Sequence, residues 1–229
     1  MNWPTINQIR SFTALPSDYT WDYLKREEIN VAIDFFQTWF PSISVGLGSP
    51  FLDRQFYEDK VALEDDPNRG IFAIVVRQNQ EIVAIATWER IDGADVIFGR
   101  VGAVAKPHRQ SRLAIAAQDL GEKMGASMGA GLIYGMATTR APYMQKALEH
   151  AGYTAVGIMP GFDQEETEPG TVRRVYEVIY AKRLAPHSDF LEPSLHNLTP
   201  AVARLYRQIF HDGASPLAID VRGTEEPLA

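Results

Sequence analysis

Cysteine is absent from the 229-residue sequence, and its absence removes several kinds of chemistry at once. Disulfides, thiolate metal sites and cysteine nucleophiles are all excluded. The five histidines, at positions 108, 150, 187, 196 and 211, show neither HxxxH nor HxH spacing, so we expect no metal site. A G-x-S-x-G motif is also missing, which leaves a catalytic serine triad without support.

Long hydrophobic runs are missing as well. The longest apolar stretches, 70–76 and 82–86, fall far short of the roughly 20 residues that a membrane-spanning helix needs. The N-terminal segment MNWPTINQIR has neither the basic start nor the apolar centre of a signal peptide. We therefore expect a cytoplasmic protein that has no membrane partner.

Positive charge is scarce: 22 Lys and Arg residues stand against 29 Asp and Glu residues, which gives a formal net charge of −7. Proteins that bind nucleic acid present a basic face to the phosphate backbone, so the composition argues against a nucleic-acid partner. A small anion held by one local basic loop remains compatible with this charge.

The residues that are present predict an α/β fold. Two β-branched stretches are separated by a polar turn and predict a hairpin, and the hydrophobic period later switches between that of helices and that of strands. The predicted helices span 18–40, 49–64, 113–130 and 142–150, and the predicted strands span 71–77, 82–90, 96–105, 132–138, 154–159 and 172–182. We expect a mixed central sheet of six to seven strands with flanking helices, and parallel pairing in its middle because crossover helices join neighbouring strands.

Three local features add detail to this fold. Ser49 and Pro50 predict the N-cap and first turn of the second helix. Glycines at 121, 125 and 129 are four apart, so they share one face on which their helix can approach the sheet closely. The last two strands are predicted to flank an acidic insert at 163–170.

The chain divides by composition into a domain at 1–184 and a Pro-rich C-terminal extension at 185–229. Within the extension only 200–210 is convincingly helical, with Thr199 as its N-cap. The extension is too short for a second domain, so we expect it to pack on the domain or on a partner subunit. The apolar face of its helix would serve a homodimer; this face consists of Val202, Leu205, Ile209 and Phe210.

The segment that carries chemistry joins the third strand to the glycine-bearing helix. Backbone N–H groups of such a turn, together with the positive end of the helix dipole, form an anion site. Lys106, Arg109 and Arg112 concentrate positive charge there in an otherwise acidic chain, and a diphosphate would fit. The alternative is an ordinary solvated basic turn that precedes a helix.

This segment resembles the signature of the GNAT acyltransferases, in which a strand ending in V-x-x-x-x-R precedes a turn of pattern R/Q-x-x-G-x-G/A. The turn here is RQSRLA at 109–114, and Gly152-Tyr153 resembles the family's later G-F/Y turn. In element order the resemblance covers roughly residues 5–184, although its specific part is about 50 residues long. It implies a GNAT-type fold and an N-acyltransferase that uses acetyl-CoA or another acyl-CoA as co-substrate.

The resemblance also implies the residues that would hold CoA. The pantetheine arm would lie in a V-shaped opening between two strands and contact the backbone of Val104 and Ala105, and the turn would hold the pyrophosphate. The turn residues concerned are Arg109, Gln110, Ser111, Arg112, Leu113 and Ala114. Arg112 stands at the motif's first glycine. A side chain there could crowd the phosphate if the backbone needs glycine-like torsions, or its guanidinium could itself bind phosphate.

The catalytic groups are less well defined, because Leu148 occupies the place of the tyrosine that protonates the leaving thiolate in many relatives. Tyr143 is the substitute candidate for the acid, and Tyr134 is a weaker candidate. The simpler explanation of Tyr143 is an aromatic residue at the start of a helix that packs under the neighbouring loop. Glu89, at the end of its strand, is the candidate base, with an exposed charge paired to Arg90 as the alternative.

Three further residues are candidates for substrate binding. Arg100 lies within a mostly apolar strand, where it either faces solvent or holds a substrate carboxylate, and Thr138 and Thr139 end the strand opposite the pantetheine arm. The leading hypothesis is acyl transfer from CoA to an amine of an unidentified acceptor. The alternatives are a long-chain N-acyltransferase and a GNAT-fold binding or regulatory protein without catalysis.

Overall fold

A computed structural model describes residues 1–91 and 93–210 of the chain. Its strands are β1 Thr20–Tyr23, β2 Val61–Ala62, β3 Ile71–Gln78, β4 Glu81–Ile91, β5 Val96–Val104, β6 Leu132–Thr138, β7 Thr154–Glu168 and β8 Thr171–Arg183. Its α-helices are α1 Ile6–Phe12, α2 Ile29–Trp39, α3 Arg54–Lys60, α4 Leu113–Ser127, α5 Tyr143–His150 and α6 Pro200–Phe210. Short 3-10 turns lie at η1 Arg26–Glu28, η2 Pro41–Ser44, η3 Gly46–Leu52, η4 Lys106–His108, η5 His187–Asp189 and η6 Leu195–Asn197.

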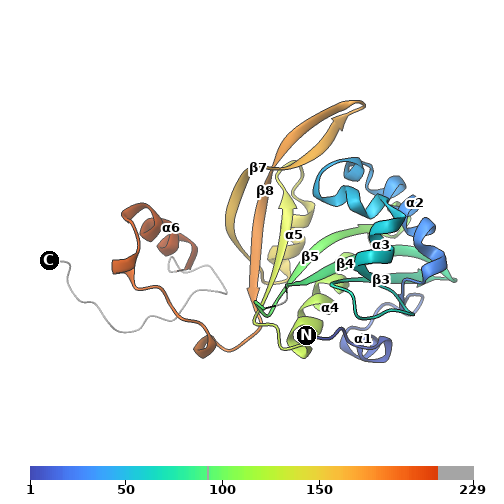
Figure 1. Cartoon of the computed structure of the whole chain (residues 1–229), viewed down its shortest axis with the longest axis horizontal. Helices are drawn as coiled ribbons and strands as arrows, with labels where there is room; N and C mark the ends of the chain where they lie inside the picture. The colour runs from blue at the N-terminus through green and yellow to red at the C-terminus, as the bar shows by residue number, and fades with distance from the viewer. Residues whose placement is uncertain (92, 211–229) are drawn as a thin grey trace.

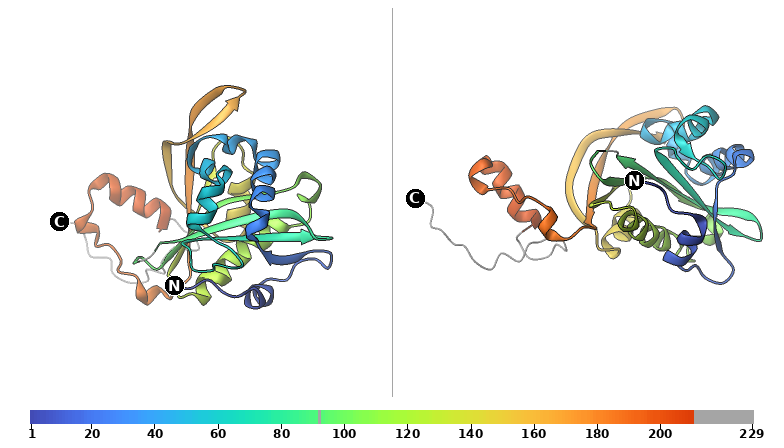
Figure 2. Two further views of the ribbon diagram at one scale, coloured as in Figure 1. Left: turned by 45° about the vertical axis from the view of Figure 1, so that its right-hand side comes forward. Right: turned by 60° about the horizontal axis from the view of Figure 1, so that its bottom comes forward.

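The described strands form one eight-stranded mixed sheet, in the order β1-β3-β4-β5-β6-β8-β7 with β2 beside β3 (Figure 1). Helices cover both faces of the sheet: Figure 2 shows α2 and α3 on one face and α1 and α4 on the other. Each face has its own apolar core, one around Leu120 of α4 and Trp88 of β4, the other around Phe36 of α2 and Ile85 of β4. The mixed α/β prediction is confirmed, with one or two strands more than expected.

In the middle of the sheet, two parallel strands pair over only part of their length. β5 and β6 are parallel, as predicted, but they pair only from Val96 opposite Leu132 to Phe98 opposite Tyr134. Beyond these positions β5 continues to Val104 and β6 to Thr138 without pairing to each other, so the two strands part. The parting leaves an opening in the sheet, with backbone groups on both sides that no neighbouring strand occupies.

The predicted helix at 18–40 is wrong in its first half. Residues Thr20–Tyr23 form strand β1 and pair with β3, Thr20 opposite Arg77 and Tyr23 opposite Ile74, and only Ile29–Trp39 is helical. The apolar residues of β1 fit helical spacing equally well, and the edge of β3, distant in sequence, decides between the two. The pattern also missed α1, although Thr5 and Gln8 form a capping box at its start.

Two further boundaries needed correction. The N-cap of α3 is Asp53, whose carboxylate accepts from the Gln55 N–H at 2.9 Å; Ser49 and Pro50 belong to η3 instead. The predicted acidic insert is strand, because β7 and β8 extend through it as a long hairpin. Glu165 lies opposite Arg173 in this hairpin, and its carboxylate accepts a hydrogen bond from the Arg140 guanidinium at 2.6 Å.

The prediction that glycines let α4 approach the sheet closely is confirmed at two of the three positions. A Cβ atom on Gly121 would lie 2.5 Å from Nε1 of the buried Trp88, and one on Gly125 would lie 2.7 Å from Cδ1 of Ile97. Gly129 lies beyond the helix end and adopts φ +79°. The second half of α4 is therefore in direct contact with the sheet.

Because of this contact, we expect Gly121→Ala to lower the free energy of unfolding by about 1–2 kcal/mol, since Trp88 must move within a packed core. Thermal or urea unfolding followed by circular dichroism measures the change. Gly157→Ala is the matched control: no heavy atom lies within 4 Å of its added Cβ, so its unfolding free energy should stay within about 0.5 kcal/mol of wild type. Equal losses in the two variants would contradict the close approach of α4.

The described part of the C-terminal segment follows β8 and ends in α6, which contacts β7 (Figure 1). The helix prediction at 200–210 is confirmed, and the Val202 N–H donates to the Thr199 hydroxyl at 3.4 Å. Val202 and Leu205 are about half exposed. Among the described residues no helix is long and apolar enough to span a bilayer. The rest of the predicted extension, from residue 211, lies outside the described residues.

Candidate functional site

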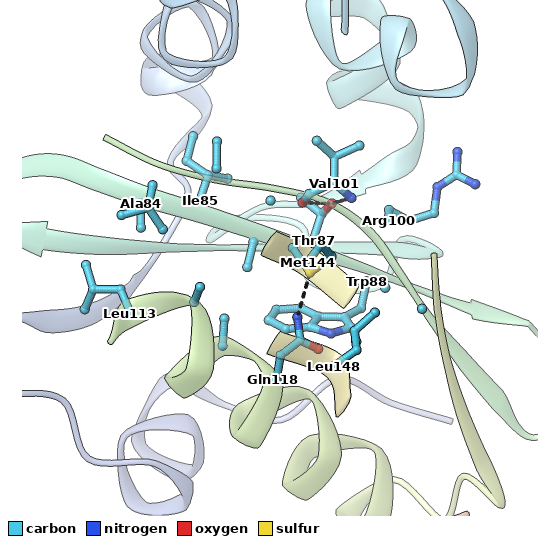
Figure 3. A pocket seen from close by; sticks show the side chains of 18 of the residues that line it. Ala84, Ile85, Thr87, Trp88, Arg100, Val101, Leu113, Gln118, Met144 and Leu148 are labelled. Carbon is cyan, nitrogen blue, oxygen red and sulfur yellow. Dashed lines mark hydrogen bonds between the residues drawn. The ribbon is translucent and has the colours of Figure 1, made fainter. Parts of the chain in front are cut away.

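A cavity of about 630 Å³ lies between the sheet and helices α4 and α5. Its walls are mainly apolar, and it follows the opening between β5 and β6. Figure 3 shows Leu113 and Gln118 of α4 facing Ala84 and Trp88 of β4 across the cavity, with Arg100 at one end. This volume falls in the range of about 300–1,000 Å³ that is typical of small-molecule sites.

The turn from β5 to α4 borders this cavity. Arg112, the residue before α4, has φ 61° and ψ 16°, which is the left-handed conformation that glycine adopts most easily. No side chain caps α4, so the first N–H groups of the helix, including those of Leu113 and Ala114, are available to a ligand. Leu113, Ala114 and Arg109 line the cavity, which places these groups at its wall.

Other turn residues already have partners. The Arg109 guanidinium donates to the carbonyls of Val104 at 3.2 Å and Trp39 at 3.3 Å, which fixes the turn to the end of β5 and to α2. The Ser111 hydroxyl lies 2.9 Å from the Tyr19 hydroxyl. Gln110 and Arg112 are exposed, and no hydrogen bond within residues 1–91 and 93–210 fixes their side chains.

Some backbone groups at the end of β5 already form hydrogen bonds within the protein. Ala105 donates its N–H to Val83 at 2.9 Å and accepts from His108 at 2.8 Å. Val104 lines the cavity and pairs with Ala84 on the side away from the opening. A ligand in the opening would therefore meet Val104 more readily than Ala105.

No protein-family model matches the sequence, and no curated protein matches it either. Solved structures do match. One is YncA of Salmonella typhimurium, solved with its cofactor acetyl-CoA: TM-score 0.58, 11% identity, covering 75% of this chain and 97% of that one. Another is the spermidine/spermine N-acetyltransferase SpeG of Vibrio cholerae: TM-score 0.59, 11% identity, covering 74% and 95%. A third is a putative acetyltransferase of the GNAT family from Desulfovibrio desulfuricans: TM-score 0.55, 12% identity, covering 73% of this chain and 99% of that one.

The chain has the GNAT acetyltransferase fold. At sequence identities of 11–13%, the matching structures establish the fold of this chain but not its activity. The activity therefore has to follow from the site. The opening between β5 and β6 and the uncapped start of α4 are where the resemblance placed the pantetheine arm and the pyrophosphate. An acyl-CoA fits this GNAT-fold site because uncapped amides, two arginines and a cavity meet at one turn.

The candidate base lies beside the cavity of the GNAT fold. Glu89 and Phe98 are opposite each other in the β4–β5 pair, and Arg100 follows on β5. The Arg100 Nη1 atom lies 3.5 Å from the Glu89 carboxylate, and its guanidinium lies 5.9 Å from the centre of the Phe98 ring. Arg100 lines the cavity, and its Nε is a buried donor for which the described residues offer no acceptor. Glu89 therefore pairs with Arg100, whereas Arg90 donates to the carbonyls of Met1 and Asn68.

The other predicted residues lie at different distances from the cavity. Tyr143 is at its mouth and 82% exposed, and Leu148 forms part of its buried wall. Tyr134 lines it as well. Thr138 and Thr139 are not among the residues that line it: the Thr138 hydroxyl accepts from the Arg140 N–H at 3.3 Å, and Thr139 is exposed.

Two polar residues at or near the cavity were not predicted as site residues, although Tyr153 belongs to the predicted Gly152-Tyr153 turn. Tyr153 is buried in the cavity wall, and its hydroxyl has no hydrogen-bond partner within the described structure; burial raises its pKa, so the hydroxyl stays protonated. Glu177 of β8 is buried opposite Thr138, and burial raises the pKa of its carboxyl to about 7, with Glu165 and Asp163 adding to the rise. A glutamate in a mainly apolar strand was the available signal for Glu177.

A second cavity, of about 240 Å³, lies between the C-terminal segment and the sheet. Leu132 and Tyr134 of β6 form one side of it, and Phe190 and Tyr206 form the other. Tyr134 lines both cavities, so the two cavities share one residue of their walls. Groups of His, Asp or Glu that could hold a metal ion are absent from residues 1–91 and 93–210.

Proposed function

We propose that this chain is an N-acyltransferase that moves an acyl group from CoA to an amine. The observation that supports this most is the junction at the start of α4, where uncapped helix amides beside Arg109 and Arg112 meet a cavity that follows the parted strands. A helix N-terminus with adjacent arginines stabilises a diphosphate. The free backbone edges of β5 and β6 can hydrogen-bond the two amides of a pantetheine arm.

Bound acyl-CoA supplies an activated thioester carbonyl. An amine nitrogen bonds to that carbon, the carbon–sulfur bond breaks, the amine loses a proton and the thiolate gains one. We assign the base to Glu89, which lies partly exposed beside the cavity and next to Arg100. We assign the acid to Tyr143, because it is the tyrosine at the cavity mouth.

We propose an amine-bearing acceptor. Asp163 and Glu165 lie close enough to Glu177 to raise the pKa of its carboxyl, and this acidic region of β7 and β8 favours a cationic ligand over an anionic one. SpeG acts on spermidine and spermine, and another matching structure is an Escherichia coli N-acetyltransferase of a ribosomal-protein alanine, so both small and protein amines occur among the matches. A homodimer through α6 stays a prediction.

Calorimetry with acetyl-CoA, followed by thiol release in the presence of polyamines and of peptides with free N-termini, tests this function. We expect CoA binding, and thiol release that depends on the amine. A chain that binds no CoA would overturn the proposal. Leu148 at the place of the usual acid favours one second candidate, a CoA-binding protein without catalysis; tight binding with no release for any amine would support that candidate.

Arg112 allows the charge and the backbone conformation of the turn to be tested separately. We expect Arg112→Ala to lower CoA affinity about tenfold, because a guanidinium–phosphate bond contributes about 1.5 kcal/mol. Arg112→Gly loses the same charge but adopts φ 61° without strain, so it should be about 1 kcal/mol more stable to unfolding than Arg112→Ala. Calorimetry and urea unfolding measure the two effects. A glycine variant that binds CoA more tightly than wild type would show the side chain to be an obstacle.

A further inference from the structure

The cavity extends well beyond the opening between β5 and β6. A row of facing residues crosses four strands: Val104 of β5 is opposite Ala84 of β4, Ala84 is opposite Val76 of β3, and Val76 is opposite Trp21 of β1. All four line the cavity. With neighbouring strands about 4.8 Å apart, the row is about 14 Å long. We call the space over this row the side branch.

The side branch exists because small residues face each other across it. Ala84 and Ala86 lie on the floor, and Ala114 and Ala117 lie in the first turns of α4 above. The second half of α4 contacts the sheet directly, at Gly121 and Gly125, whereas its first half faces these alanines. The helix and the sheet therefore enclose free space beneath the first turns of α4.

The side branch is apolar. Val76 and Leu113 are buried hydrophobic residues, and the polar atom of Trp21 points elsewhere: its Nε1 donates to the Thr13 carbonyl at 2.8 Å. The polar wall residues Thr87 and Gln118 also have partners, the Val101 carbonyl and the Met144 sulfur. A branch lined in this way disfavours water and binds apolar ligands.

A pantetheine arm does not account for this space. Its two amides need the free backbone edges of β5 and β6, whereas β3 and β1 lie two and three places further along the sheet. An acetyl group would reach no further than the neighbourhood of the thiol. A hydrocarbon chain that leaves the thioester and turns back beneath the first turns of α4 would fill this volume.

We propose that the side branch binds the hydrocarbon chain of the acyl donor, so that the preferred donor is an acyl-CoA with an extended apolar chain rather than acetyl-CoA. This inference rests on the proposed acyltransferase function and specifies its donor. The chain would run from the β5–β6 opening past Ala86 and Ala84 to Val76 and end against Trp21.

Calorimetry of the full chain with CoA, acetyl-, butyryl-, hexanoyl- and octanoyl-CoA, without acceptor, tests the proposal. Each added methylene should raise affinity about three- to fourfold until the branch is full. Equal affinities across the series would overturn the proposal and leave the acyltransferase function intact, because CoA itself would still bind. A chain that binds neither CoA nor any thioester would overturn both.

Variants locate the bound chain. Ala117→Leu fills the branch from the helix, and we expect it to lower the ratio of octanoyl-CoA to CoA affinity at least tenfold. Ala126→Leu, on an exposed position of the same helix, should keep the wild-type ratio. If Ala117→Leu fails to fold, Ala86→Val makes a smaller change on the opposite wall, with an expected loss of at least threefold. A wild-type ratio in folded Ala117→Leu and Ala86→Val would place the chain elsewhere and overturn the proposal.

Discussion

Replacing Arg109 and Arg112 together with glutamate is expected to weaken CoA binding about 100-fold or more. Each substitution would remove a charge-assisted hydrogen bond to phosphate, which contributes about 1.5–3 kcal/mol of binding free energy. Each new carboxylate would in addition repel the diphosphate. The loss should be smaller at high ionic strength, because both side chains are exposed at the surface. Calorimetric titration with CoA at two salt concentrations measures both effects.

The matched control reverses the charge of two arginines on α6, by replacing Arg204 and Arg207 with glutamate. Both are exposed, they change the net charge by the same amount, and they lie on a helix that does not line the large cavity. We expect this control to bind CoA within about twofold of wild type, since distant surface charges are screened. A loss in the control as large as in the turn variant would mean that net charge, and not the turn, governs binding.

The second large effect concerns the buried carboxyl of Glu177. Its pKa is about 7 in the folded chain, against 4.5 for an ordinary glutamate. Between these values the folded state keeps a proton that the unfolded state has lost, so stability falls as pH rises through this window. Above pH 7 the folded state bears the full cost of a buried charge. Glu177→Gln does not titrate, and we expect it to raise the free energy of unfolding at pH 8 by about 2 kcal/mol.

Urea unfolding of wild type and Glu177→Gln from pH 4 to pH 8 measures this difference. The two curves should lie together at low pH and separate as pH rises. Glu81→Gln, at an exposed strand start, makes the same change of charge without the burial and should run parallel to wild type. Parallel curves for Glu177→Gln as well would show that Glu177 is not held protonated by its surroundings.

The central part of the fold could be predicted because local signals and long-range packing agree there. Helix α4, strand β6 and helix α5 each show one clear period and one clear boundary, such as the proline before α5. The N-terminal part could not. Trp21 fits a helix and a strand equally well, and the choice depends on pairing with Val76, which lies 55 positions away in the sequence.

For the site, the turn at 106–114 was predictable because its basic residues stand out in an acidic chain. The side branch was not, because it depends on a row of residues from four strands whose register no local pattern specifies. Glu177 was missed for a related reason. The strand that contains Glu177 was predicted correctly. The burial of the Glu177 side chain, however, depends on β8 lying between β6 and β7, near Asp163.

Because Tyr134 borders both cavities, truncating the chain before the C-terminal segment would affect measurements of activity. Tyr134 lines the large cavity and also the smaller one, whose other side is the segment that carries Phe190 and Tyr206. A version that ends at residue 184 would expose to water the surface at Tyr134 that lies opposite Phe190 and Tyr206 in this chain. Activity measured on such a shortened protein would report a remodelled wall, and assays should begin with the intact polypeptide.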